Sequence, residues 1–99
     1  MRVAFVGYRD IGDKPEFSLH EFTDDVDKVK TYISSVGASG GNDFPEDVQG
    51  GFHKALNMNW EPHSIKTVFH IFDAPGHGKD ICDQGHDNYP KGSPLGYVL

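Results

Sequence analysis

The chain has 99 residues, which is the size of one domain, and residues 1–99 are expected to form a single unit. It carries 15 acidic against 9 basic side chains, a formal net charge of −6, which argues against nucleic acid and anionic membranes as partners. No apolar run is long enough to span a membrane, and the N-terminus lacks a signal-peptide pattern. The single cysteine, Cys82, excludes an internal disulfide, and together these features favour a reducing, cytoplasmic setting.

Two short strands are predicted near the N-terminus. Residues 2–10 begin with a continuous apolar run, which is typical of a strand buried on both faces. Residues 17–22 alternate between apolar and polar side chains and predict a strand near the edge of a sheet. Because a short turn joins the two segments, we expect them to pair antiparallel.

Residues 23–36 predict an amphipathic helix. Thr23 is a suitable N-cap, and the two aspartates that follow it complement the positive end of the helix dipole. Gly37 is expected to end the helix. One apolar stripe is expected to face the sheet: Val26, Val29, Ile33 and Val36.

A second helix is predicted over residues 44–58. Pro45 suits the first helical position, and Glu46 and Asp47 then lie in the first turn, where the dipole favours acids that face solvent. Two glycines at positions 50–51 cost about 1 kcal/mol each relative to alanine inside a helix. Their expected use is close approach to a neighbouring strand or loop.

Residues 66–74 predict a further buried strand that ends on Asp73. The remainder of the chain is rich in Gly, Pro and Asp and is expected to form loops, with the start of another element at residues 95–99. The order strand, strand, helix, helix, strand is that of part of an α/β sandwich.

Acidic residues follow the predicted strands and open the second helix. In an open α/β sheet ligands bind beyond the carboxyl ends of the strands, where Asp10, Asp73 and Asp43 are expected. Carboxylates gathered on one edge repel one another unless a proton or cation neutralises them, and a hard divalent cation such as Mg²⁺ accepts oxygen ligands. Asp43 and Asp73 are the predicted metal ligands. A turn or cap role competes at Asp10, and capping of the second helix competes at Asp43.

A second, looser cluster suggests zinc or hydrolase chemistry in the C-terminal part of the chain. Its spacing matches neither HExxH nor CxxC, and no nucleotide-binding or nucleophile-elbow motif occurs in the chain. His70 is also explained as a core histidine, and Cys82 as an ordinary thiol. The cluster comprises His70, Asp73, His77, Asp80, Cys82, Asp83, His86 and Asp87.

Four stretches resemble successive segments of a von Willebrand factor A domain, of the variety found in eukaryotic alpha-kinases and hemicentin-like proteins. They are VAFVGYRD, FTDDVDKVKTYI, ASGGNDFPEDVQGGFHKAL and FHIFDAPGHG, followed by DNYPKGSP, and they cover nearly the whole chain. The resemblance implies an α/β, Rossmann-like three-layer sandwich that holds Mg²⁺ at a metal-ion-dependent adhesion site made from three loops. Asp43 stands at the second loop's ligand and Asp73 at the third loop's, and a partner's carboxylate often completes the shell.

The chain departs from that family at the first loop, because no Asp-x-Ser-x-Ser motif occurs in it. The resemblance therefore implies an incomplete fold, truncated at both ends, with exposed sheet edges and weak Mg²⁺ binding. It favours a non-catalytic protein-interaction module that is a fragment or regulatory piece of a larger protein. The alternatives are an accessory domain of an alpha-type serine/threonine protein kinase, a small zinc-dependent hydrolase, and self-association through the sheet edges.

Overall fold

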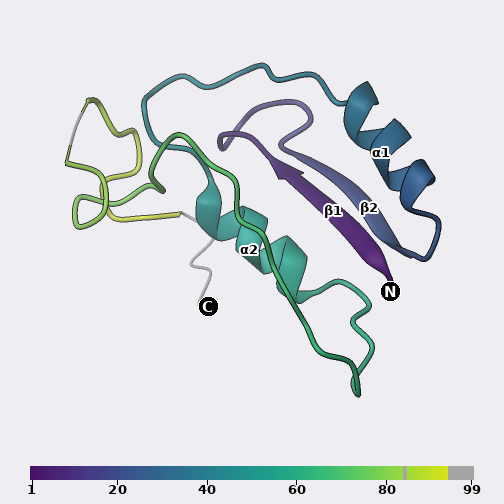
Figure 1. The fold of residues 1–99 in the computed structure, drawn as a ribbon. Coiled ribbons are helices and arrows are strands. Elements are labelled where there is room, and N and C mark those ends of the chain that lie inside the picture. The colour runs from purple at the N-terminus through teal and green to yellow at the C-terminus, as the bar shows by residue number, and fades with distance from the viewer. Residues whose placement is uncertain (84, 94–99) are drawn as a thin grey trace.

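The computed structural model describes residues 1–83 and 85–93, so the element expected at 95–99 lies outside the described residues. The chain begins with a hairpin, continues through two helices and ends in irregular segments (Figure 1). Within the described part, no helix has the length and apolar character needed to cross a membrane. The regular elements are β1 (Val3–Tyr8), β2 (Phe17–Thr23), α1 (Val26–Ser35) and α2 (Val48–Leu56).

The predicted antiparallel pairing of the first two strands is confirmed. β1 pairs with β2 so that Tyr8 lies opposite Phe17 and Val6 opposite Leu19, with an irregularity in the register near the start of β1. Beyond Tyr8 the Arg9 N–H still donates to the Glu16 carbonyl at 2.8 Å. The ladder therefore runs up to the turn that follows β1.

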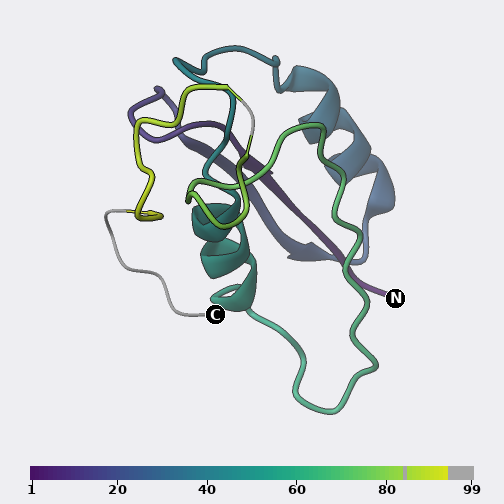
Figure 2. The ribbon, with the colours of Figure 1, turned by 90° about the vertical axis from the view of Figure 1, so that its left-hand side faces the viewer.

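The two helices contact opposite faces of this hairpin. The ring of Phe5 packs edge to face on Tyr32 of α1, with 6.1 Å between ring centroids. Tyr8, three positions further along β1 and so on the other face, packs on Gly51 of α2. Figures 1 and 2 show the hairpin between the helices. The larger Rossmann-like sandwich stays a prediction, since the described sheet has two strands.

Helix α1 begins later than predicted, and its N-cap is Asp25 instead of Thr23. The Asp25 side chain accepts from the Lys28 N–H at 3.2 Å, whereas Thr23 Oγ1 accepts from the Asp25 N–H at 3.1 Å. Thr23 is unavailable as a cap because it is still paired with β1 as the last residue of β2. Of the predicted apolar stripe, Val29 is buried, whereas Ile33 is 43% exposed.

Helix α2 also begins later than predicted, because the residues before it are engaged elsewhere. Glu46 forms an isolated parallel bridge with Gly76, and its N–H donates to the Pro75 carbonyl at 2.9 Å. Asp47 is the N-cap: it is 1% exposed and its side chain accepts from the Gly50 N–H at 3.0 Å. The expectation that Asp47 faces solvent in the first turn is therefore wrong.

The predicted strand at 66–74 is absent, and this segment is irregular. It runs alongside β1 and α2 (Figures 1 and 2), and its apolar side chains are exposed, with Phe69 at 87% and Ile71 at 91%. A strand needs a hydrogen-bonding neighbour, and no described segment pairs with it. The expectation for His70 holds in part, since its Nε2 lies 2.8 Å from the Tyr8 hydroxyl.

The buried core of the described residues is small and unusually polar. The buried hydrophobic side chains are Val29 and Cys82, whereas Asp10, Asp47 and His77 are each at most 2% exposed. Buried polar groups cost free energy unless they are hydrogen-bonded, so their contacts decide the stability of this fold.

The glycines in α2 allow a stability test. A Cβ at Gly51 would lie 2.6 Å from Tyr8 Cδ1, so Gly51→Ala forces α2 away from β1. The better helix propensity of alanine offsets about 1 kcal/mol of the overpacking cost, and we expect a net loss of about 1–2 kcal/mol in urea unfolding. Gly37→Ala is the control, because nothing lies within 4 Å of its Cβ, and it should change stability by less than about 0.5 kcal/mol. Equal stability of the two variants would contradict the close packing.

Candidate functional site

Three loops meet where β1 ends, and we call this place the loop junction. It is formed by residues 9–13, residues 40–47 and the segment from 75 to 90, of which residue 84 is not described. Backbone hydrogen bonds join the loops: the Asp47 N–H donates to the Arg9 carbonyl at 3.1 Å, and the Phe44 N–H donates to the His86 carbonyl at 3.4 Å. Segments far apart in sequence are thereby held at one end of the hairpin.

Asp13 fastens the first loop to the glycine-rich second loop. Its Oδ2 accepts from the Asp10 N–H at 2.9 Å and from the Gly41 N–H at 3.0 Å. Gly40 and Gly41 have φ angles of 96° and 84°, a region that other residues rarely adopt. The glycines are therefore needed to point the Gly41 N–H at Asp13, and the sequence had not singled Asp13 out.

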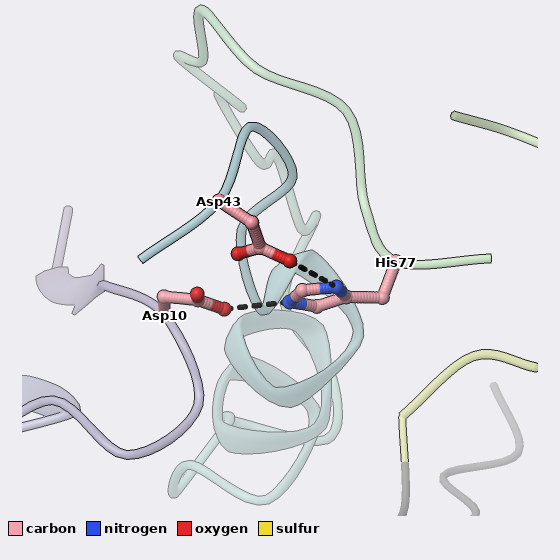
Figure 3. Close-up of side chains that lie close together, drawn as sticks. All are labelled: Asp10, Asp43 and His77. Atoms are coloured by element: carbon pink, nitrogen blue, oxygen red, sulfur yellow. Dashed lines mark hydrogen bonds and ion pairs between the residues drawn. The ribbon is translucent and has the colours of Figure 1, made fainter. Parts of the chain in front are cut away.

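The centre of the loop junction is His77, whose ring is held between two carboxylates. Its Nε2 lies 2.6 Å from Asp10 Oδ1, and its Nδ1 lies 2.7 Å from Asp87 Oδ1. Asp87 is itself fixed, because its carboxylate accepts from the Gly78 and Tyr89 N–H groups, each at 2.8 Å. Figure 3 shows the ring edge-on between the loops.

Burial and hydrogen bonds shift the pKa values of these three groups in different directions. Burial lowers the pKa of His77, but hydrogen bonds to Asp87 and Asp10 outweigh this and leave it raised. Burial opposes ionisation of Asp87, yet hydrogen bonds from His77, Gly78 and Tyr89 bring its pKa below the usual value. The Asp10 pKa is raised by burial and by Asp43, although His77 acts against this. The lowered pKa of Asp87 favours an ionised carboxylate that accepts from His77 Nδ1–H, and the 2.6 Å contact is a second hydrogen bond, between Nε2 and Asp10.

Asp43, predicted from the sequence as a metal ligand, lies beside this pair. Its side chain is fully buried, and Oδ2 accepts from the Asn88 N–H at 2.7 Å and lies 3.8 Å from His77 Nδ1. Its Oδ1 is buried without a hydrogen-bond donor. Ligand atoms of Asp10, Asp43 and His77 all lie within 4.8 Å of one another, and the described residues contain no other such group of three.

Asp73, the second predicted ligand, lies outside that group. It is exposed and lines a cavity of about 520 Å³ together with Tyr8 and Glu46. Burial raises the pKa of Glu46, and the charges of Asp10, Asp13, Asp43 and Asp73 raise it further. Asp43 and Asp73 therefore lie on the same acidic edge, with Glu46 in the field of both.

The looser His/Asp cluster predicted for the C-terminal segment does not gather around one point. His77 and Asp87 meet at the loop junction, but Asp80, Asp83 and His86 are exposed, and His86 Nε2 lies 2.7 Å from the Asn88 side chain. No sequence motif links His77 with Asp10, 67 positions earlier. Tertiary structure alone brings them together.

A second carboxyl pair lies near the loop junction. Burial, followed by a hydrogen bond to Asp47 and the charges of Asp47, Asp10 and Asp13, raises the pKa of Glu16 to about 7. Neither Glu16 Oε1 nor Asp47 Oδ2 receives an N–H donor. Burial and the neighbouring Asp47 carboxylate therefore favour the protonated form of Glu16 beside the N-cap of α2.

The other edge of β1 borders an apolar cavity of about 780 Å³. β1 pairs with β2 on one side only, and across the cavity runs the irregular segment 64–71. The far wall includes Val68, which is 57% exposed, and Ile71. The floor comes from the face of α2 that contains Phe52 and Ala55.

Comparison with known proteins finds a similarity to an alpha-protein kinase. Over 82 residues, 83% of its length, the chain is 39% identical to the alpha-protein kinase vwkA of Dictyostelium discoideum. The chain spans only 13% of that kinase, so the similarity concerns a segment of it. No protein-family model matches the chain, and no solved structure matches it.

The Glu16 pair predicts a specific pH dependence. Between pH 4.5 and 7 the folded protein keeps a proton on Glu16 that the unfolded chain loses, so this group's stabilisation is lost as the pH rises through that window. We expect Glu16→Gln to remove the loss and to be more stable than the wild type at pH 8, by roughly 1–3 kcal/mol in urea unfolding. Glu61→Gln, at an exposed site, is the control. If stability falls with pH in Glu16→Gln as it does in the wild type, the raised pKa of Glu16 is not the cause of that loss.

Proposed function

We propose that the chain is a protein-interaction module of the von Willebrand A type, a regulatory piece of a larger protein, with a weak divalent-cation site at its acidic edge. The observation that carries the proposal is the unpaired edge of β1 beside an apolar cavity. The similarity to a segment of an alpha-protein kinase supports an accessory role within a larger protein of that kind. We propose further that this role is non-catalytic and cytoplasmic.

The shape and chemistry of the cavity suit an additional β-strand. An open sheet edge presents unpaired N–H and C=O groups that readily accept another strand. β1 and the segment 64–71 run in the same direction on either side of the cavity (Figures 1 and 2). A strand lying between them would satisfy the free edge of β1 and cover Val68 and Ile71. Its source would be another part of the larger protein, a partner protein or a second copy of the chain.

The acidic edge suits the cation part of the proposal. Asp43 Oδ1 has no hydrogen-bond donor, and Glu46 has a raised pKa among four aspartates, so positive charge is favoured there. Mg²⁺ is commonly bound through one or two carboxylates and keeps several waters, so Asp43 and Asp73 could hold it without touching each other. A partner's carboxylate would complete the shell.

The strand hypothesis can be tested with a peptide. A peptide corresponding to the residues just before the matching stretch of the Dictyostelium kinase is titrated onto the chain, and amide hydrogen exchange is followed in β1. We expect binding and new protection in β1. Val68→Lys should weaken binding at least about tenfold, because an unpaired charge in an apolar slot costs more than about 1.4 kcal/mol.

Leu56→Lys is the matched control. Leu56 is 62% exposed, a fraction similar to the 57% of Val68, but its side chain does not line the cavity. Sedimentation velocity tests whether a second copy of the chain, instead of the peptide, occupies the apolar cavity beside β1. The strand hypothesis would be refuted if the chain is monomeric and its β1 amides exchange equally fast with and without the peptide.

The Mg²⁺ site can be tested by isothermal titration calorimetry. We expect weak binding, with a Kd on the order of 1 mM or about −4 kcal/mol, because the first family loop is missing. Asp43→Asn and Asp73→Asn should each abolish it, whereas Asp27→Asn, an exposed site on α1, should not. Binding that survives Asp73→Asn would contradict the pairing of these two ligands.

A further inference from the structure

The donors around His77 differ in kind from those expected for Mg²⁺. They are two carboxylates and an imidazole, contributed by all three loops of the loop junction (Figure 3). We propose that Asp10, Asp43 and His77 bind a divalent transition metal, with Zn²⁺ as the reference ion, through one oxygen of each carboxylate and Nε2 of the histidine. This centre does not depend on the strand-binding function.

The ligand types select the class of metal. Mg²⁺ demands oxygen ligands in near-ideal octahedral geometry, whereas imidazole suits zinc, iron, nickel and copper. Three protein ligands from histidine and carboxylate are typical of zinc sites that keep a fourth position for water or another ligand. A carboxylate supplied by a bound partner has the chemistry to occupy that position.

The surroundings of His77 are those that a metal-binding histidine needs. Ligating histidines almost always give their other ring N–H to a carboxylate or carbonyl, which fixes the orientation of the ring and the nitrogen that faces the metal. In this chain the carboxylate partner is Asp87, whose Oδ1 lies 2.7 Å from His77 Nδ1, and two backbone N–H groups hold Asp87 in place. Nε2 is thereby left to face Asp10.

The charge balance at this point favours a cation. The side chains of Asp10, Asp43 and His77 are each at most 1% exposed, and Asp43 Oδ1 has no donor. In Figure 3 the Asp43 carboxylate lies beside the His77 ring, with one oxygen directed at Nδ1. Carboxylates so close together repel one another unless a proton or a cation lies between them. On binding, the metal takes the place of the proton between His77 Nε2 and Asp10, which passes to solvent.

The experiment uses the whole chain, stripped of metal with a chelator and titrated with Zn²⁺ or Co²⁺. On Zn²⁺ binding, NMR of the ¹⁵N-labelled histidines should show a change at His77 Nε2, while Nδ1 keeps its proton. His77→Gln and Asp10→Asn should lose saturable binding, and Asp87→Asn should weaken it about 10- to 100-fold. His86→Gln, in an exposed histidine of the same segment, should bind as the wild type does.

Two outcomes would overturn the proposal: no change at His77 Nε2 with saturating Zn²⁺, or equal loss of binding in His86→Gln. The NMR result comes from the wild type, so it stands even where a buried variant fails to fold. Asp73→Asn should leave Zn²⁺ binding intact. That variant distinguishes this centre from the Mg²⁺ site. Hydrogen exchange in β1 tests strand binding in the apolar cavity independently of both metal sites.

Discussion

The fold depends on the imidazole of His77 held between Asp10 and Asp87. This contact joins the end of β1 to the segment that follows Pro75. Few apolar side chains are buried, so hydrophobic packing contributes little to holding these segments together. Removing one partner of a buried ion pair leaves a buried charge uncompensated, which typically costs about 3–5 kcal/mol. Asp43 and the start of α2 are held by backbone hydrogen bonds to the same segments: the Asn88 N–H donates to Asp43, and the Asp47 N–H donates to the Arg9 carbonyl. A chain of 99 residues has little apolar burial with which to compensate for loss of the His77 contact.

The three acids before α2 show how one short stretch supports several roles. Asp47 caps the helix from a buried position, and Glu46 connects to the segment at 75–76 through its backbone. Asp43 is the one whose carboxylate enters the loop junction, as the loop position and the resemblance had indicated. Sequence reasoning separated Asp43, as a predicted ligand that stays a prediction, from Glu46 and Asp47, which it assigned to a generic helix-dipole role. Backbone contacts decide their positions: Glu46 is bonded to the segment at 75–76, and the Asp47 N–H donates to the Arg9 carbonyl. No local pattern encodes those contacts.

Local signals predicted the local structure well. The hairpin and both helices were predictable because apolar periodicity and a short turn specify them within a few residues. The strand at 66–74 was not, because its apolar run gives the propensity for a strand but not the neighbour that a strand needs. For the site, the acids at strand and loop ends were identifiable from position. The pairing of His77 with Asp10 was not, since only the meeting of three loops brings together residues 67 positions apart.

The open edge of β1 and the loop junction lie at positions that are geometrically linked. β1 ends at the loop junction, and the segment across the cavity runs the same way and leads into Asp73 and Pro75 (Figure 1). The carboxyl ends of parallel strands meet at one edge of a sheet, so a strand inserted parallel to both would deliver the residues that follow it to Asp10, Asp43 and Asp73. Oxygen ligands on those residues would then add to whichever cation the carboxylates hold. If both proposals hold, each site forms without the other, but a strand bound in the cavity would add its ligands to the metal, and each binding event would strengthen the other by the same factor.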